Sequence, residues 1–483
     1  MPSASKLLSI ILTLALAQVV GNAVAQPLPP EVEAALQKAK LPRDAVAIVV
    51  ADAEGKTAPR VSYRANIAMN PASVMKLVTT SAALDLLGPA YVWNTPVYID
   101  GAVRDGTLYG NLVLKGMGDP KLVVERLWLL LRRVQGLGVK TIAGDIVLDH
   151  SAFSLPPTDA ADFDGEPLRP YNAAPDALLL NYKSLVMTFV PDRTREAAQV
   201  QYDPPLAGVL EQASVPLSAG PCGDYRATLR ADFSDPTRVR FAGSYPAACQ
   251  EKVWPIAYAD PRSYAARAVE GMWREMGGKL AGSARDGSLR ASTAAPLMPA
   301  FEFASPTLAE AVRDINKYSN NVMAQQLFLT LSLPPRIAGA PAAGAATPQA
   351  SREIIRRWWQ ERIGGGTDVP ELDNGSGLSR DGRVSAQALT RLLQTAFLSP
   401  WMPELMSSLP VAGIDGTMRR NRSAAYGSAH LKTGSLRDVA AMAGYVRAAS
   451  GRRYVLVAIA NHANAGAARA AWDALLDWTV KDN

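Results

Sequence analysis

A serine and a lysine three positions apart, Ser73 and Lys76, form a pair that can carry out acyl transfer. In a helix such residues share one face, with Cβ atoms about 5–6 Å apart, so the amine can reach the hydroxyl. A lysine takes a serine proton only if burial or a second cation lowers its pKa. The same spacing occurs by accident at Ser3 and Lys6, so the pair alone is a weak sign of a nucleophile.

A second motif is Ser319-Asn320-Asn321, which is the chain's one Ser-x-Asn. The Ser319 hydroxyl could relay a proton, and the Asn321 amide could hold a substrate carbonyl. The alternative is an ordinary serine that caps a helix.

A third motif is Lys432-Thr433-Gly434-Ser435. Lys432 can neutralise a substrate carboxylate, Thr433 can hydrogen-bond it, and Gly434 lets a substrate backbone approach closely. A lone Lys-Thr-Gly is usually a turn. Here two β-rich stretches follow it, so we expect an edge strand that offers hydrogen bonds to an extended peptide.

The elements expected around these motifs alternate in type. A helix should follow Pro71 and stop at Gly88, and another should begin after Ser305, with Pro306 at its first position and an interruption near Tyr318. Five stretches are expected to be strands, and the last three predict an antiparallel sheet closed by a helix over 467–480. Whether the first two strands join this sheet is left open by local pattern. The five strands are 45–51, 61–65, 429–432, 440–447 and 454–461.

The middle of the chain is expected to be β-rich, with one helix over 121–134 and a Pro- and Ala-rich loop over 334–349. Its two cysteines, Cys222 and Cys249, can pair in an oxidising compartment or remain as separate thiols. A bond would add about 3 kcal/mol of stability on the chain-entropy estimate. The expected strands of this region are 97–103, 107–114, 145–148, 185–190 and 239–241.

Three weak motifs in this order, each on a suitable element, are a much stronger signal together. They resemble those of the penicillin-recognising serine enzymes, which include penicillin-binding proteins and serine β-lactamases. About 245 residues separate Ser73 from Ser319. Such an insertion is similar to that of the class C low-molecular-mass penicillin-binding proteins, the D-Ala-D-Ala carboxypeptidase/endopeptidase family. Further stretches that fit this family are 71–73, 115–120, 144–146, 374–380 and 413–417.

The resemblance implies an α+β fold. A β-lactamase/transpeptidase-like domain, with an antiparallel sheet and helices on both faces, would comprise residues 26–96 and 295–483. A large β-rich insertion between the Ser-x-x-Lys and Ser-x-Asn motifs, residues 97–294, would form one or two smaller domains.

The resemblance also implies a serine DD-peptidase that acts on peptidoglycan stem peptides. Ser73 would attack the carbonyl between two D-Ala residues, with Lys76 as general base. Ser319, with Lys432, would pass the proton to the leaving amine. No cofactor or metal would take part.

Substrate binding is implied for the third motif. Lys432, Thr433 and Ser435 would bind the terminal carboxylate of the peptide or of a β-lactam inhibitor, beside Gly434. The backbone N–H groups of Ser73 and Ser435 would form the oxyanion hole, where losing one donor typically costs about 3–4 kcal/mol of barrier.

Several alternatives remain at this stage. A β-lactamase would need rapid hydrolysis of the acyl-enzyme, and a non-catalytic peptidoglycan-binding or partner-binding protein could share the fold. A Ser-His-Asp hydrolase would have to use His150, His430 or His462, yet the chain has no Gly-x-Ser-x-Gly elbow. Metal chemistry lacks a His-Glu-x-x-His motif. The sequence does not separate carboxypeptidase from endopeptidase action, and it leaves the oligomeric state open.

The N-terminus predicts export to the periplasm. Lys6 precedes an apolar run over 7–20, and Ala23 and Ala25 suit cleavage after a signal peptide of residues 1–25. A retained N-terminal anchor is the alternative. The net charge of +6 is dispersed, which suits a wall or membrane surface and does not indicate nucleic acid.

Overall fold

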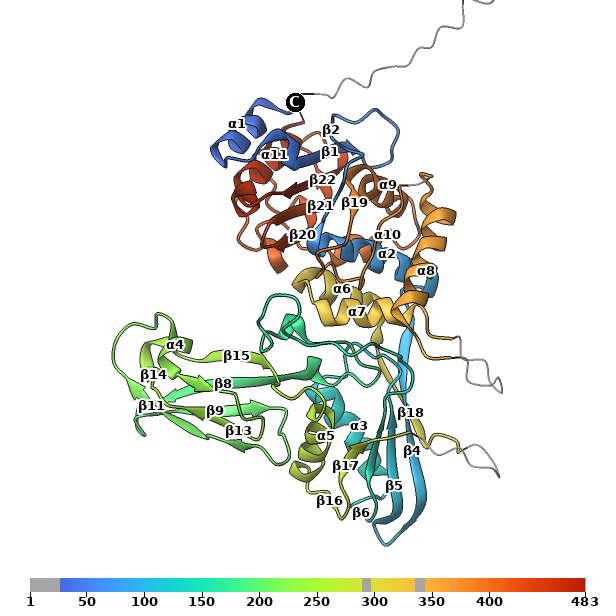
Figure 1. The fold of residues 1–483 in the computed structure, drawn as a ribbon, viewed down its shortest axis with the longest axis vertical. Coiled ribbons are helices and arrows are strands. Elements are labelled where there is room, and N and C mark those ends of the chain that lie inside the picture. The colour runs from blue at the N-terminus through green and yellow to red at the C-terminus, as the bar shows by residue number, and fades with distance from the viewer. Residues whose placement is uncertain (1–26, 289–296, 335–343, 367, 483) are drawn as a thin grey trace, which may run out of the picture.

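The computed structural model describes residues 27–288, 297–334, 344–366 and 368–482. The predicted signal peptide lies outside these residues. The chain forms two parts, one above the other in Figure 1, and the two long strands β4 (Val92–Arg104) and β18 (Phe301–Thr307) run between them. Within the described residues, no helix combines the length and apolar character needed to cross a bilayer.

The upper part contains a five-stranded sheet in the order β2-β1-β22-β21-β20, with antiparallel neighbours throughout. The two early strands therefore join the late ones, because β1 pairs with β22 along its whole length. The third motif lies on β20, at the edge of the sheet, as predicted. The strands are β1 (Val46–Asp52), β2 (Val61–Tyr63), β20 (Ala429–Leu436), β21 (Val439–Arg447) and β22 (Arg453–Asn461).

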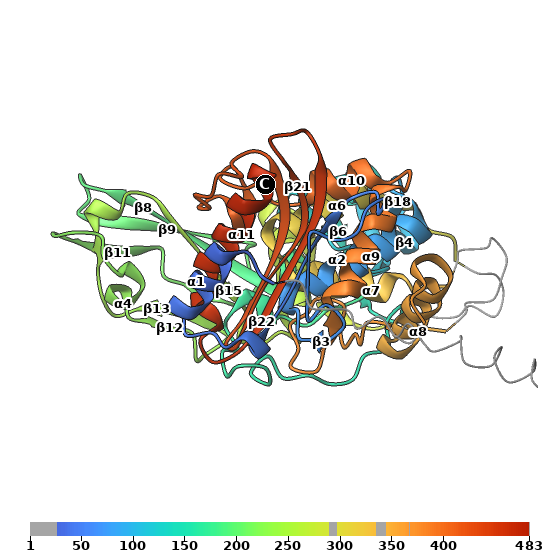
Figure 2. The ribbon, with the colours of Figure 1, turned by 90° about the horizontal axis from the view of Figure 1, so that it is seen from above.

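Both faces of this sheet are buried, which explains the nearly unbroken apolar run of β1. Ala47 and Val49 pack into the cluster on the helix-rich face, whereas Val46 and Ile48 pack on the opposite face. The opposite face is covered by α1 (Pro30–Lys38) and α11 (Arg469–Lys481) (Figure 2). The helix-rich face is covered by α2 (Lys76–Leu87), α6 (Leu308–Tyr318), α7 (Asn321–Thr330), α8 (Pro348–Trp358), α9 (Ala386–Phe397) and α10 (Met402–Ser408).

Two predicted helix limits were wrong, and side-chain capping explains both. Pro306 does not begin α6 but lies in β18, because Thr307 forms a capping box with Glu310 and so fixes the first helical residue at Leu308, two positions later. The predicted loop over 334–349 ends earlier than expected, because the Thr347 side chain accepts from the Ala350 N–H and starts α8. Residues 335–343 lie outside the described part of the chain.

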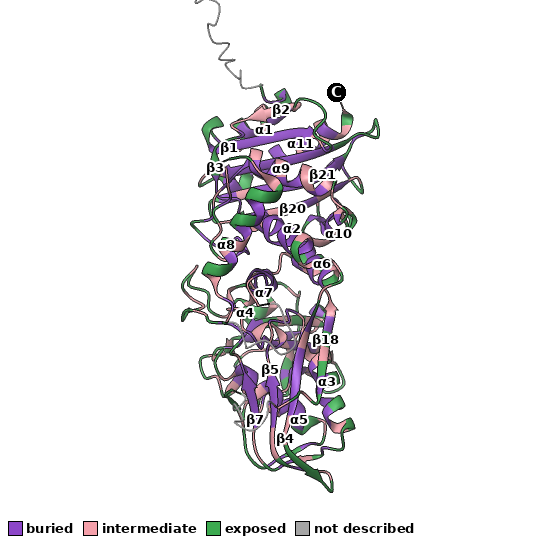
Figure 3. Cartoon of the chain, turned by 90° about the vertical axis from the view of Figure 1, so that its right-hand side faces the viewer, coloured by how far each residue is buried: buried purple, intermediate pink, exposed green. Residues whose placement is uncertain are grey.

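The lower part has one apolar core shared by two sheets and the helices α3 (Val124–Gly136) and α5 (Tyr264–Glu275). Figure 3 shows this core and the upper sheet as two separate buried regions. One sheet contains β4, β18, β5 (Thr107–Lys115), β6 (Thr141–Ile142), β7 (Ile146–Asp149), β16 (Lys279–Leu280) and β17 (Ala284–Asp286). The other contains β8 (Ser184–Asp192), β9 (Ala197–Asp203), β11 (Ser214–Ser218), β14 (Tyr245–Pro246) and β15 (Lys252–Ala257).

Smaller elements complete the molecule, and one disulfide fastens the lower part. Cys222 and Cys249 are bonded, with their Cα atoms 4.5 Å apart, so the pairing left open by the sequence is made. The predicted limits of the insertion, residues 97 and 294, fall inside β4 and ahead of β18, and this division stays a proposal. The remaining elements are α4 (Tyr225–Leu229), β10 (Leu210–Glu211), β12 (Ala231–Asp232), β13 (Arg238–Phe241), β3 (Ala68–Met69) and β19 (Val384–Ser385).

Candidate active site

Ser73 lies in a tight turn at the start of a helix. A short 3₁₀ helix, Ala72–Met75, leads directly into α2, as the sequence predicted for the neighbourhood of Ser73. Ala72 has a φ of 49°, a left-handed conformation that is unfavourable for any residue with a Cβ. Asn70 holds this turn, since its Oδ1 accepts from the Ala72 N–H at 2.8 Å and its Nδ2 donates to the Ser379 carbonyl at 2.9 Å.

Lys76 is fully buried against the nucleophile. Its Nζ lies 2.9 Å from Ser73 Oγ, 2.6 Å from Asn321 Oδ1 and 2.6 Å from the Ser376 carbonyl oxygen. Burial, followed by the charge of Lys432, lowers the pKa of Lys76 well below the ordinary lysine value.

The three neighbours of the Lys76 amine can accept from the three N–H groups of its charged form, and they also suit its neutral form. A neutral amine has two N–H groups and one lone pair. The two N–H groups can donate to Asn321 Oδ1 and the Ser376 carbonyl, both of which only accept. The lone pair then faces the Ser73 hydroxyl, which is the arrangement that a base needs before it removes the proton.

Ser319 and Lys432 form a second hydroxyl–amine pair. The Nζ of Lys432 lies 2.9 Å from Ser319 Oγ and 2.8 Å from the Thr433 carbonyl oxygen. Lys432 is also fully buried, and burial lowers its pKa to about 7. The Lys432 amine can therefore both release and take up a proton near neutral pH.

Ser319 is the C-cap residue of α6, but its side chain does not cap the start of α7. It occupies a left-handed position between α6 and α7, with a φ of 58°. The cap of α7 is Asn320, whose side chain accepts from the Met323 N–H at 3.0 Å. The Ser319 hydroxyl is thus left to face Lys432.

At Gly434, strand β20 packs closely against the backbone of the turn that contains Ser73. A Cβ added there would lie 2.4 Å from the Pro71 carbonyl oxygen and 3.0 Å from the Ser73 backbone nitrogen. Both are backbone atoms, so neither can move aside cheaply. The close approach requires glycine and fixes the distance between the edge strand and Ser73.

We expect Gly434→Ala to slow acylation by a β-lactam roughly 100-fold, since displacing reacting groups by about 1 Å can cost that much. Stopped-flow measurement of the acylation rate and a melting curve would test this. The matched control is Gly136→Ala, because a Cβ at this position in α3 meets nothing within 4 Å. Equal acylation by both variants would show that the contact does not position Ser73.

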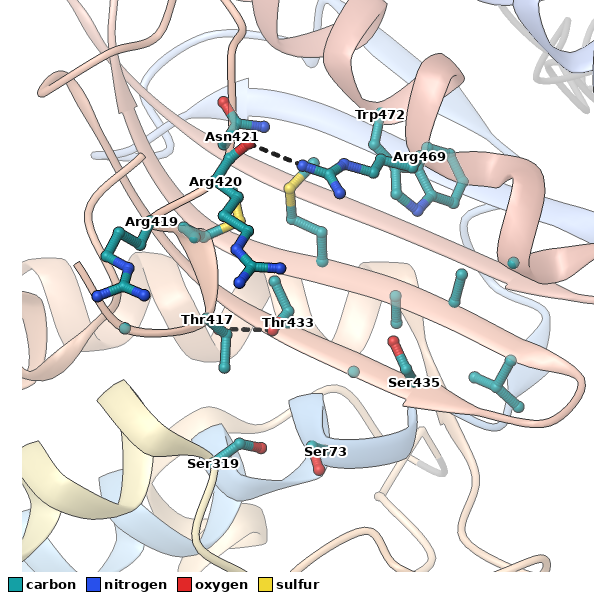
Figure 4. A pocket seen from close by; sticks show the side chains of 18 of the residues that line it. Ser73, Ser319, Thr417, Arg419, Arg420, Asn421, Thr433, Ser435, Arg469 and Trp472 are labelled. Carbon is teal, nitrogen blue, oxygen red and sulfur yellow. Dashed lines mark hydrogen bonds between the residues drawn. The ribbon is translucent and has the colours of Figure 1, made fainter. Parts of the chain in front are cut away.

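A cleft of about 880 Å³ opens beside these groups. Ser73 and Ser319 lie at its floor, and β20 forms one wall with Thr433 and Ser435 (Figure 4). Thr433 Oγ1 donates to Thr417 Oγ1 at 2.7 Å and so joins the strand to the loop that precedes it. Residues 410–412 cover the start of β20, at residues 429–431, whereas the edge that follows lines the cleft and leaves room for an extended peptide.

The lower part of the molecule reaches the site through one loop. Asn321 Nδ2 donates to the Tyr171 carbonyl at 3.2 Å, while its Oδ1 takes the Lys76 amine. Two hydrogen bonds join Gln326 of α7 to the backbone of Asp176, at 2.8 and 2.9 Å. The insertion therefore orients the amide that contacts Lys76.

The structure brings all the residues of the three predicted motifs into one site: Ser73, Lys76, Ser319, Asn321, Lys432, Thr433, Gly434 and Ser435. The sequence did not predict three groups as parts of the site, namely Asn70, the Ser376 carbonyl and Thr417. Ser376 and Thr417 lie in stretches that fit the family, but a backbone acceptor and a loop threonine have no chemical signature in sequence. A short run, Arg419-Arg420-Asn421-Arg422, was also passed over and lines the outer cleft.

The three histidines have other surroundings. Nδ1 of His430 lies 3.1 Å from the Met406 carbonyl oxygen, and Nδ1 of His150 lies against Asp176. The Nδ1 of His462 accepts from the Asn464 N–H at 3.0 Å. Across the described ranges, no three His, Cys, Asp or Glu side chains converge on a possible metal position.

An antiparallel sheet between two helical layers, with a serine–lysine pair beneath its edge strand, defines a transpeptidase-like serine enzyme. The model of the D-Ala-D-Ala carboxypeptidase 3 (S13) family matches residues 28–481. The chain belongs to this family and is a serine-type D-Ala-D-Ala peptidase.

Known proteins agree with this assignment. The D-alanyl-D-alanine carboxypeptidase of Actinomadura sp. (strain R39) is 30% identical over 422 residues, which cover 82% of this chain and 74% of the relative. The crystal structure of penicillin binding protein 4 (dacB) from Haemophilus influenzae has a TM-score of 0.70 at 22% identity, covering 93% of this chain and 99% of that one. The same Haemophilus protein complexed with a β-lactam gives a TM-score of 0.63 at 22% identity, covering 89% and 93%.

A further structural likeness is to the predatory endopeptidase Bd0816 of Bdellovibrio bacteriovorus, solved in complex with the immunity protein Bd3460. Its TM-score is 0.56 at 14% identity, covering 90% of this chain and 94% of that one. The structures show that the predicted fold class is correct.

Proposed function

We propose that Ser73 is the acyl acceptor of this peptidase and that Lys76 is its general base. The observation that carries the proposal is the buried Lys76 amine, which lies 2.9 Å from Ser73 Oγ. Among the described residues it has two carbonyl acceptors for its N–H groups and no carboxylate contact.

In the acylation step, Ser73 Oγ attacks the carbonyl carbon of the penultimate D-Ala while its proton moves to Lys76 Nζ. The tetrahedral intermediate collapses when the C–N bond breaks, and the leaving amine takes a proton from Ser319, which Lys432 replaces. The proton on Lys76 then passes through solvent to the deprotonated Lys432, which restores both amines. Water attacks the ester, Lys76 takes one of its protons, and that proton returns to Ser73 Oγ as the ester bond breaks and the peptide acid leaves.

In this proposal the remaining motif residues bind the substrate and stabilise the oxyanion. Backbone N–H groups of Ser73 and Ser435 receive the oxyanion. Thr433 and Ser435 hydrogen-bond the carboxylate of the leaving residue, and Lys432 supplies positive charge beneath it. Asn321 holds the amide of the acyl part while Gly434 admits its backbone.

The substrate in this proposal is a peptidoglycan stem peptide, and a β-lactam is an inhibitor that acylates Ser73. The name of the Actinomadura relative, a D-alanyl-D-alanine carboxypeptidase, supports release of terminal D-Ala. The Bdellovibrio protein is named an endopeptidase, and we propose that the present enzyme also cleaves cross-links. We also propose a periplasmic enzyme at the cell wall, from the N-terminal signal pattern at residues 1–25.

Mass spectrometry of purified muropeptides after incubation with the enzyme tests the activity. We expect loss of terminal D-Ala from pentapeptides and conversion of cross-linked dimers to monomers, in one experiment. Muropeptides that stay intact beside rapid hydrolysis of penicillin would instead identify a β-lactamase. Muropeptides retained by the protein without either reaction would indicate a binding protein.

A further inference from the structure

Four arginines line the outer end of the cleft. We call Arg419, Arg420, Arg422 and Arg469 the arginine wall. The first three belong to the loop between Thr417 and β20, and Arg469 is the first residue of α11. Arg419, Arg420 and Arg469 line the cleft that contains Ser73, and all four line a hollow of about 690 Å³ that continues it.

Among the described residues, a neighbouring carboxylate partly balances one member of the arginine wall, since Asp473 interacts with the charge of Arg469. In the described part of the chain, no carboxylate pairs with Arg419, Arg420 or Arg422, and the Arg469 guanidinium donates to the Arg420 carbonyl at 2.9 Å. The one carboxylate among the lining residues, Asp473, accepts from Asn421 Nδ2 at 2.7 Å.

Like charges repel one another. At 0.1 M salt this repulsion is largely screened only beyond the Debye length of about 10 Å. Guanidinium groups also present paired N–H donors that match a carboxylate or phosphate. A group of exposed arginines in a cleft, with fewer carboxylates than guanidinium groups among the described lining residues, is therefore suited to an anion.

The position of the arginine wall defines which part of a substrate it meets. Thr417 hydrogen-bonds Thr433, and the arginines follow Thr417 in the chain. Figure 4 shows the Arg420 guanidinium directed toward Thr433, with Arg469 reaching across from α11. Thr433 is the group that we assign to the carboxylate of the leaving residue. The arginine wall consequently lies beyond that carboxylate, on the leaving side of Ser73.

We propose that the arginine wall binds a second carboxylate of the leaving fragment. A single D-Ala leaving group has one carboxylate and ends at Thr433. The leaving stem of a cross-link carries further carboxylates and extends past it. The inference rests on the proposed function and deepens it, because it makes acidic cross-linked peptides the favoured substrates.

The test compares two cross-linked peptide dimers that share one acyl part and differ only in the leaving stem. In one dimer the outlying carboxylates of that stem are free, and in the other they are amidated. The acid preference is the kcat/KM for the acid dimer divided by the kcat/KM for the amide dimer. We expect it to fall about tenfold in the double variant Arg419→Gln/Arg420→Gln, as for the loss of one charge-assisted hydrogen bond.

The control variants separate charge from folding. Arg193→Gln makes the same change on an exposed turn of the insertion and should leave the ratio unchanged. Arg420→Lys should retain part of the preference, since it keeps the charge but loses the planar fork. An unaltered ratio in the double variant, or equal losses for acid and amide dimers, would overturn the inference.

Two further measurements distinguish a failure of the proposed function from a failure of the proposed role of the arginine wall. If labelled penicillin fails to acylate Ser73 in the wild-type protein, the proposed function fails and not the subsite. If the double variant keeps its acid preference but loses salt-dependent binding to a soluble polyphosphate, the arginine wall holds a phosphate polymer and the substrate assignment is wrong.

Discussion

Replacing Ser73 by alanine is expected to abolish covalent labelling by a fluorescent penicillin, whereas the wild-type protein takes up one equivalent. Peptidase turnover should fall by on the order of 10⁴-fold or more, because the variant lacks the hydroxyl to which we assign the ester. The geometry supports this, since the Lys76 amine lies 2.9 Å from Ser73 Oγ and Ser319 faces Lys432. Gel fluorescence and intact-mass measurement provide the readout.

The matched control for this experiment is Ser407→Ala. Ser407 is an exposed serine on α10 and does not line the cleft. It should label like the wild type. If Ser73→Ala were labelled to the same extent as Ser407→Ala, another residue would be the acyl acceptor and the assignment of Ser73 would be wrong.

Replacing Lys76 by methionine should slow acylation by about 10²- to 10⁴-fold, which is the usual contribution of a general base. Methionine has a similar length and is suited to the fully buried position. The rate constant for acylation by penicillin, measured by rapid mixing, tests the expectation. Unchanged acylation would assign the base to another group.

The pH dependence of stability gives an independent check on Lys76. Burial lowers its pKa in the folded enzyme, whereas the unfolded chain titrates near the ordinary lysine value of about 10.4. Between these two pKa values the unfolded chain binds more protons, so the free energy of unfolding should rise with pH.

Urea unfolding of the wild type between pH 7 and pH 10 should show this rise, and Lys76→Met should reduce its slope. Lys432 stays in both proteins and contributes equally, because its pKa is also lowered, to about 7. An identical slope in the two proteins would mean that Lys76 keeps an ordinary pKa in the folded state.

Local sequence patterns predicted the kinds of element that carry the three motifs, and the family resemblance supplied the fold class. The alternation of apolar residues and the stop at Gly88 gave α2 and the late strands nearly as observed. The order of the motifs then indicated the family, whose membership the comparisons confirm. These features are local, so each could be read from a few consecutive residues.

What the sequence did not predict depends on contacts between distant segments. The pairing of β1 with β22 brings together residues about 400 positions apart, and no local pattern encodes it. The Ser376 carbonyl acts through its backbone, so its side chain gives no sign of the contact with Lys76. The positions of Asn70 and the arginine wall at the site likewise depend on contacts that exist only in the folded chain.

The placement of β22 has a consequence for when the protein can work. This strand is the middle of the five, yet it is made of Arg453–Asn461, close to the C-terminal end. Ser73 is synthesised well before β22, so the sheet beside it can close only after residue 461 has been made. A polypeptide that stops before β22 lacks the strand that joins β1 to β21, and we expect it to be inactive although it contains Ser73.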